Sequence, residues 1–185
     1  MSQPVPGWSN TRLVAECLSG NENAWSALLD RYKNLIYAIP LRYGAPHQDA
    51  ADIFQAVCLD LFNELPRLRD AEALQSWLIR VTTHKCYHWK RRQLQAGDLD
   101  SDGPGAVQAI SPDVLAEIER EQLVRQAIGQ LPARCREMIE LLFFEQPPVP
   151  YSEVARRLKL ATGSIGFIRG RCLQRLKKIL EEKGF

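Results

Sequence analysis

Long apolar runs, a secretion signal and abundant cysteine are all missing from this sequence of 185 residues. No stretch approaches the roughly 18 apolar residues that a membrane-spanning helix needs. The N-terminus, MSQPVPGWSN, has neither a cationic start nor an apolar core, so it does not read as a signal peptide. We therefore expect a cytoplasmic protein that makes no contact with a membrane.

The five cysteines are odd in number and widely spaced, which does not suggest a disulfide framework. Four of them occupy apolar positions at helical spacing, and we expect these to be reduced core residues: Cys17, Cys58, Cys86 and Cys172. His84, Cys86 and His88 form a lone H-x-C-x-H pattern, but no second ligand pair accompanies it. The sequence therefore predicts no metal site.

Catalytic signatures are also missing. No nucleophile, base and orienting residue are suggested together, so an enzyme with a Cys/His site is not supported. Neither a Walker motif nor a dinucleotide-binding fingerprint is present. We expect a protein that is not an enzyme and that holds no cofactor.

The sequence shows no strand pattern, and its periodic segments are helical. Apolar residues recur at helical spacing through most of the chain, which predicts an all-α fold. We expect a loose N-terminus at 1–9 and two small helical domains at 10–93 and 115–185. Residues 94–114 are acidic, contain glycine and proline, and lack periodicity, which is typical of a flexible linker.

Charge is distributed in blocks although the net charge is only +2. Residues 80–92 hold five Lys or Arg and no acid, and residues 98–121 hold seven acids and one Arg. Residues 156–178 again hold eight Lys or Arg and no acid. This basic, acidic, basic order predicts two surfaces that face polyanions, separated by an acidic connector.

Residues 151–176 read as two helices joined by a short turn, after prolines that stop the preceding helix. The second helix has an apolar stripe formed by Ile165, Ile168, Cys172, Leu176 and Ile179. Its opposite side carries Phe167, Gly170, Arg171, Gln174 and Lys178. Such a helix can enter the major groove while flanking cations bind phosphates. An ordinary amphipathic hairpin with a solvated basic face explains this segment equally well.

Residues 49–65 show the most regular apolar stripe in the chain. Its members are Ala50, Ile53, Phe54, Val57, Cys58, Leu61, Phe62 and Leu65. The polar side includes Asp52 and Gln55 and, unexpectedly, Leu59. A lone exposed leucine is ordinary on a surface, but beside Asp52 and Gln55 it can also belong to a protein-docking face.

The helix expected over 73–92 ends in THKCYHWKRR, where cations alternate with Tyr87 and Trp89. Aromatic rings stack on unpaired bases and cations follow the backbone, so this composition suits single-stranded nucleic acid. The alternative is a helix C-terminus at which the dipole favours Lys and Arg.

In their order and spacing, five motifs resemble the sigma factors of bacterial RNA polymerase, specifically the extracytoplasmic-function (ECF) group of the sigma-70 family. The motifs are GNENAWSALLDRY, DAADIFQAVCLDLF, LQSWLIRVTTHKC followed by KRR, LVRQAIGQLPARCREMIELLFF, and YSEVARRL followed by GSI and RCLQRL. The resemblance covers most of residues 10–180. It implies that the two domains are sigma regions 2 and 4, the latter with a helix-turn-helix.

The resemblance also implies the function and the partners. Such a protein binds core RNA polymerase, recognises promoter DNA, melts the −10 element and starts transcription, and an anti-sigma factor holds it inactive. The alternative is a stand-alone helix-turn-helix regulator that works without docking on polymerase. That alternative gives the first 92 residues no clear role.

Three sets of site residues follow from the resemblance. Docking on the clamp helices of the largest polymerase subunit is implied for Asp49, Asp52, Gln55 and Leu59, while region 4 rests on the flap. Binding of the −10 element is implied for Arg67, Arg69, Arg80, His84, Lys85, His88, Lys90, Arg91 and Arg92. Binding of the −35 element by the recognition helix is implied for Ser164, Gly166, Phe167, Arg169, Gly170, Arg171, Gln174 and Arg175.

The sequence departs from the family pattern at several of these positions. His84 stands where the family usually has Asn, and His88 where it often has Asp. Gly166, Phe167 and Ile168 replace a common Lys-Ser-Arg type of sequence. The promoter sequences therefore cannot be carried over from a relative. Phe167 can either touch a thymine methyl group or pack on the neighbouring helix.

Overall fold

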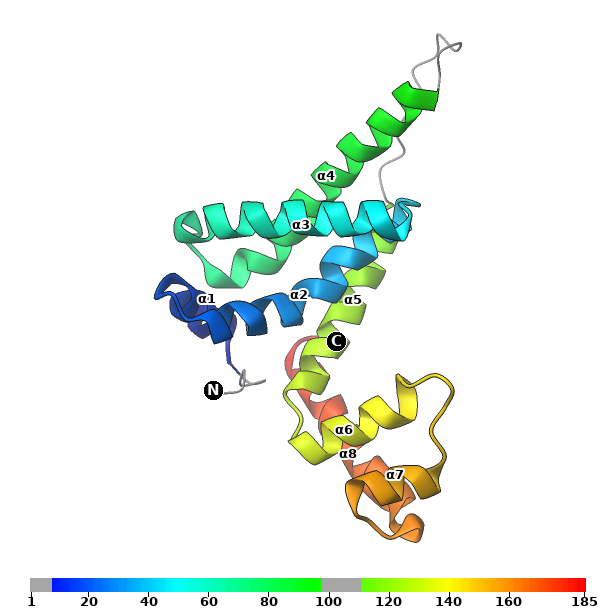
Figure 1. Cartoon of the computed structure of the whole chain (residues 1–185). Helices are drawn as coiled ribbons and strands as arrows, with labels where there is room; N and C mark the ends of the chain where they lie inside the picture. The colour runs from blue at the N-terminus through cyan, green and yellow to red at the C-terminus, as the bar shows by residue number, and fades with distance from the viewer. Residues whose placement is uncertain (1–7, 98–110) are drawn as a thin grey trace. The chain divides into compact units, whose positions relative to one another are not determined.

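The computed structural model describes residues 8–97 and 111–185, and every regular element within these ranges is a helix (Figure 1). The prediction of an all-α fold is confirmed. The chain divides into two compact units, the first ending at Gln122 and the second beginning at Leu123. Most of the predicted linker, and the first seven residues of the predicted loose N-terminus, lie outside the described residues.

The first unit contains α1 to α4 and the first part of α5, together with two short 3-10 turns. Their bounds are α1 (Asn10–Leu18), α2 (Glu22–Arg42), α3 (His47–Glu64), η1 (Leu65–Arg67), η2 (Ala71–Ala73), α4 (Leu74–Gly97) and α5 (Pro112–Gly129). The second unit contains the rest of α5 and the elements α6 (Ala133–Phe143), α7 (Tyr151–Leu158), η3 (Thr162–Ser164) and α8 (Ile165–Glu182).

Side chains and glycine decide where the first two helices begin and end. Ser9 caps α1, because its Oγ accepts a hydrogen bond from the Arg12 backbone N–H over 3.2 Å. Gly20 closes this helix with a φ of 84°, a conformation that glycine adopts without a steric penalty. Asn21 then caps α2 by accepting hydrogen bonds from two backbone N–H groups of its first turn. Serine before a helix and glycine just after it are among the residues preferred at these two positions.

The core of the first unit is built around α2, which packs against α1, α3 and α4 (Figure 1). Its fully buried side chains include Leu28, Ile36 and Ile39. Leu61 of α3 and Leu78 of α4 meet them in the same apolar cluster. Burying an aliphatic side chain of this size stabilises the fold by about 1.5–3 kcal/mol. This core holds the outer faces of α3 and α4 in place.

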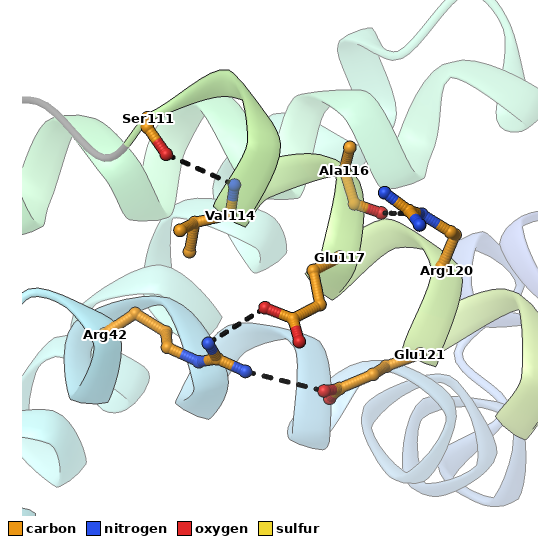
Figure 2. Close-up of polar contacts among 7 residues, drawn as sticks. All are labelled: Arg42, Ser111, Val114, Ala116, Glu117, Arg120 and Glu121. Carbon is orange, nitrogen blue, oxygen red and sulfur yellow. Dashed lines mark hydrogen bonds and ion pairs between the residues drawn. The ribbon is translucent and has the colours of Figure 1, made fainter.

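The acidic first half of α5 packs on the first unit (Figure 2). Ile118 is 2% exposed and joins the core of that unit. Gln122 donates a hydrogen bond from Nε2 to the Arg31 carbonyl of α2 over 2.8 Å. Arg42 pairs with Glu117 at 3.0 Å and with Glu121 at 3.6 Å. The start of α5 is therefore attached to the first unit by apolar contacts of Ile118 and Val114 and by the polar contacts around them.

A disulfide between Cys135 of α6 and Cys172 of α8 joins two helices of the second unit. The prediction that Cys172 is reduced is wrong. Sequence spacing does not reveal this pair, because 37 positions separate the two residues and only the packing of α6 on α8 brings their Cα atoms within 5.3 Å. Cys17, Cys58 and Cys86 are free thiols, as predicted.

Candidate nucleic-acid interface

The last two helices of the chain form a helix-turn-helix. α7 ends at Leu158, and Lys159 adopts the left-handed conformation with a φ of 54°. This lets the Leu160 N–H donate to the Ala155 carbonyl over 2.8 Å, a common way of ending a helix before a sharp turn. Arg134 of α6 also donates to the Leu158 carbonyl over 3.1 Å. These contacts hold the end of α7 against α6, and the turn sets the direction in which α8 begins.

One side of α8 faces the core of the second unit and the other faces solvent. Ile165, Cys172 and Leu176 are buried. Among the predicted −35 residues, Ser164 and Arg169 are half-buried. The remaining predicted −35 residues are all exposed: Gly166, Phe167, Gly170, Arg171, Gln174 and Arg175. Six of the eight predicted −35 residues are therefore exposed, and contact of any of the eight with DNA stays a prediction.

Two arginines of α8 are engaged inside the second unit. Arg169 donates a hydrogen bond to the Tyr151 hydroxyl of α7, and its guanidinium lies 5.9 Å from the centroid of that ring. Arg175 Nη1 lies 4.0 Å from the Sγ of Cys135 on α6. These contacts orient both guanidinium groups, so neither is a freely rotating surface charge.

Phe167 and Arg171 lie one turn apart on the exposed side of α8. The Phe167 ring is 71% exposed, so it lies in solvent rather than between helices. The guanidinium of Arg171 lies 5.9 Å from the centroid of this ring, within the range of a cation–π contact. Together they present an apolar plane and a cation in the N-terminal half of the helix.

Glu153 of α7 neutralises part of the basic segment, although it lies just before the basic run at residues 156–178 and so is not counted within it. Arg156 donates to both carboxylate oxygens of Glu153, at 2.8 and 2.7 Å, and Arg157 donates to one of them at 2.8 Å. These hydrogen bonds, that from Arg156 first, lower the pKa of Glu153 to about 2. Two of the eight cations counted in the sequence are therefore already paired.

The outer surface of α4 carries a row of imidazole, aromatic and cationic groups. His84 and His88 are exposed, with their Nε2 atoms 3.0 Å apart, and Tyr87 is 40% exposed beside His88. The predicted −10 residues that are also exposed are Arg67, Arg69, Arg80, Arg91 and Arg92. Arg67 pairs with Glu64 at 2.7 Å. Lys90 is half-buried, with its Nζ 5.8 Å from the centroid of the Trp89 ring.

Two of the predicted site residues tie α3 to α4. Lys85 of α4 is half-buried and pairs with Asp60 of α3 at 2.7 Å. Asp49 of α3 is also half-buried and accepts a hydrogen bond from Trp89 Nε1 of α4 over 3.0 Å. Sequence periodicity could not show these contacts, because they depend on how two helices pack. Both residues have a structural role in addition to any role in binding.

The outer face of α3 exposes an apolar pair beside polar groups. Asp52 and Gln55 are exposed, and Leu59 is 66% exposed. Phe62, which the apolar stripe predicts as buried, is 63% exposed and lies 5.5 Å from the Trp25 ring, centroid to centroid. Leu59 and Phe62 are three residues apart and so share one helix face. That spacing was the sequence signal that could have identified Phe62.

Known proteins resemble this chain along most of its length. The RNA polymerase sigma-H factor of Pseudomonas aeruginosa is 26% identical over 165 residues, covering 83% of this chain and 84% of that protein. The RNA polymerase sigma factor CnrH of Cupriavidus metallidurans is 26% identical over 180 residues, covering 91% and 93%. The ECF RNA polymerase sigma factor SigW of Bacillus subtilis is 21% identical, covering 91% and 95%. A solved structure of CnrH in complex with the cytosolic domain of CnrY aligns with 94% of this chain and 97% of its own, at 21% identity and a TM-score of 0.41.

A helix-turn-helix in one helical unit and a helix rich in basic and aromatic residues in the other are typical of proteins that bind nucleic acid. The family model of sigma-70 region 2 matches residues 28–95, which include α3 and most of α4. The chain is an ECF-type sigma factor of the sigma-70 family. It directs transcription initiation as a non-enzymatic subunit of RNA polymerase.

Two features are absent from the described residues, 8–97 and 111–185. None of their helices combines the length and the apolar character that crossing a membrane requires. Within the same ranges, no cluster of three or more His, Cys, Asp or Glu side chains could hold a metal ion. His84 and His88 meet only as a pair, and Cys86 is fully buried.

Proposed function

We propose that the two units of this sigma factor contact different parts of the promoter, and that α8 reads the −35 element. The observation that carries this proposal is the exposed side of α8, where Phe167 and Arg171 stand together above a buried stripe. A helix with these dimensions fits the major groove. Phe167 can contact a thymine methyl there, while Arg171 binds a base edge or a phosphate.

The −10 element is assigned to the outer surface of α4 and the turn that precedes it. Tyr87 and the imidazoles of His84 and His88 offer stacking faces to unpaired bases. The exposed Arg91 and Arg92 continue this surface with two charges that can follow the backbone. Melting costs about 1.4 kcal/mol per base-pair step on average, so the protein must hold the opened strand.

We assign binding of core polymerase to the outer face of α3 in the first unit. Contact with the polymerase flap is assigned to the early helices of the second unit. Exposed Leu59 and Phe62 form an apolar centre, and Asp52 and Gln55 lie on the same helix as a polar rim. An apolar centre with a polar rim is the usual anatomy of a protein interface. This arrangement supports docking on a large partner.

The division into two sites also predicts how affinity arises. Groove contact by one short helix depends mostly on phosphates and is weakly specific. Two weak sites gain strength when a large partner holds their spacing constant. The free protein should therefore bind promoters weakly, and the complex with core polymerase should bind them tightly.

Run-off transcription from a library of promoter fragments tests the proposal. Core polymerase is used alone and with the protein, and the control variant carries Arg171→Ala. We expect specific starts only when core polymerase and the wild-type protein are both present, with fewer starts for the variant. Aligning the starts then gives the two promoter elements. Tight duplex binding by the free protein without any gain over core polymerase would instead favour a stand-alone regulator.

We infer two further features of this sigma factor, its compartment and an inhibitory partner. Work on RNA polymerase requires that the protein act in the cytoplasm. An anti-sigma factor is the expected inhibitor, and the exposed Leu59 and Phe62 are a surface that it can cover in competition with polymerase. Co-purification of the tagged full chain from its own host, with and without Leu59→Asp, tests this point. A regulator retained by the wild type and lost by the variant supports it, whereas retention by both places the contact elsewhere.

A further inference from the structure

The single disulfide among the described residues lies in the helix-turn-helix unit. Cys172 is 1% exposed and sits in the middle of α8, whereas Phe167 and Arg171 of the same helix are exposed. Cys135 is 7% exposed and belongs to the first turn of α6. The bond therefore ties the helix that carries the predicted DNA contacts to the helix that supports it.

The environment of Cys135 differs from that of the free cysteines. Burial raises the pKa of Cys17 to about 11 and that of Cys86 to about 12, and it also raises the pKa of Cys58. A raised pKa makes these thiols weaker nucleophiles, because the thiolate is the reactive form. Cys135 instead lies at a helix N-terminus, with Arg175 Nη1 4.0 Å from its sulfur. Both features stabilise a thiolate.

Access to this sulfur is through the first turn of α6. Pro132 precedes that turn and provides no side-chain hydrogen bond to cap it. First turns of this kind open at low free-energy cost compared with the rest of a helix. Cys135, the more exposed of the two, is then the sulfur that meets a reagent from solution.

The second unit is small enough for one covalent bond to decide how much of it is folded. It begins only at Leu123, and a domain of about 60 residues buries only about 60% of the surface that its unfolded chain exposes. Its core residues include Met138, Ile139, Val154 and Ile165. A cross-link that closes a long loop removes conformational entropy from the unfolded state.

We propose that Cys135 and Cys172 form a reversible redox site that controls how firmly α8 is held, with hydroperoxides as oxidants and small dithiols as reductants. The effect on DNA rests on the function proposed above for α8. Oxidation orders the recognition helix and favours duplex binding. Reduction releases α8 from α6 and also allows the Cys135 thiolate to draw Arg175 away from a phosphate.

The chemistry balances in two steps. The Cys135 thiolate attacks a hydroperoxide oxygen, the O–O bond breaks, and Cys135 becomes a sulfenic acid while the alkoxide or hydroxide takes up a proton. The Cys172 thiol then attacks that sulfur, and water leaves as the disulfide forms. In the reverse direction a dithiol reduces the bond by two thiol–disulfide exchanges and is itself oxidised to a disulfide.

Hydrogen exchange of the full-length protein without DNA tests the redox site independently of the proposed function. Wild-type protein is compared after treatment with hydrogen peroxide and with dithiothreitol, and alkylation with mass spectrometry confirms the state of each cysteine. We expect amides of α8 to exchange on the order of a hundredfold faster in the reduced state, with α2 and α3 unchanged. Equal α8 exchange in the two states would overturn the proposal.

A second readout measures binding to a labelled pool of random-sequence duplexes at low salt. If the reduced unit is folded about one-tenth of the time, its dissociation constant rises about tenfold. Cys135→Ser/Cys172→Ser should match reduced wild type in both redox states, whereas the control Cys58→Ser should respond as wild type does. A redox response that persists in the double variant would place the site elsewhere. Redox-dependent α8 exchange together with equal duplex binding in the two redox states would retain the redox site and refute its coupling to DNA binding by α8.

Discussion

The attachment of α5 to the first unit should depend on Ile118 rather than on the ion pairs around it. Ile118 is 2% exposed and belongs to the core of that unit, so truncation to alanine should cost about 3 kcal/mol. Arg42, Glu117 and Glu121 keep 42%, 53% and 46% of their side-chain surface exposed. Exposed ion pairs contribute about 0.2–1 kcal/mol each and are screened by salt. Arg42→Gln should therefore cost much less than Ile118→Ala.

Hydrogen exchange of α5 and tryptophan fluorescence together measure this difference. A loss of about 3 kcal/mol corresponds to roughly hundredfold faster exchange in the first half of α5. The four tryptophans all lie in the first unit, at Trp8, Trp25, Trp77 and Trp89. Their fluorescence should report a lower urea midpoint for Ile118→Ala.

The matched control for this experiment is Glu119→Ala, at an exposed position of the same helix. It should leave both the exchange of α5 and the urea midpoint close to wild type. If Arg42→Gln released α5 as strongly as Ile118→Ala, the ranking of apolar anchor over exposed ion pair would be wrong. Raising the salt concentration should separate the two cases further, because only the ion pairs are screened.

Three other predictions concern the candidate surfaces. Arg171→Ala should weaken promoter binding and lower the salt slope by about one unit if Arg171 touches a phosphate, and an unchanged slope in a salt titration would remove it from the contacts. The pKa of Glu153 is lowered from 4.5 to about 2. Its contribution to stability is therefore fully present at a pH above the pKa of the unfolded state and is lost as the pH falls toward 2. Thermal midpoints of Glu153→Gln should accordingly change less than those of wild type over this range. Leu59→Asp should reduce affinity for core polymerase while the circular dichroism spectrum stays unchanged. The double variant Asp52→Ala with Gln55→Ala should do the same. Normal binding by both variants would mean that the docking face lies elsewhere.

Local features of the sequence were enough to predict the helical class, and some helix ends also depend only on nearby residues. Ser9 and Gly20 mark the two ends of α1 because capping and left-handed backbone depend on residues close in sequence. The apolar stripe of α8 predicts its buried side for the same reason, since helical periodicity alone places Ile165 and Leu176 together. The family followed from motif order, and the comparisons confirm it.

Features that depend on packing between helices could not be predicted in this way. The Cys135–Cys172 bond joins residues 37 positions apart, and nothing in the spacing singles out this pair among five cysteines. Phe62 lies at the margin of a stripe, where only the position of neighbouring helices decides whether a ring is covered. Glu153 lies just before a basic run, so counting charges within the run overestimated the free cations of the helix-turn-helix.

The contacts between α3 and α4 connect the two surfaces that we assign to polymerase and to the −10 element. Trp89 donates to Asp49, and Lys85 pairs with Asp60, so each helix supplies one member of each contact. A change at Asp49 would therefore disturb the position of α4 as well as the face of α3. Loss of polymerase binding in Asp49→Ala could not be assigned to a missing contact with polymerase. Asp52 is exposed on the same helix, and its substitution is the more informative test of docking. The same reasoning makes Arg91 a better probe of −10 binding than Lys85, because its side chain is exposed whereas Lys85 is half-buried and holds α4 on α3.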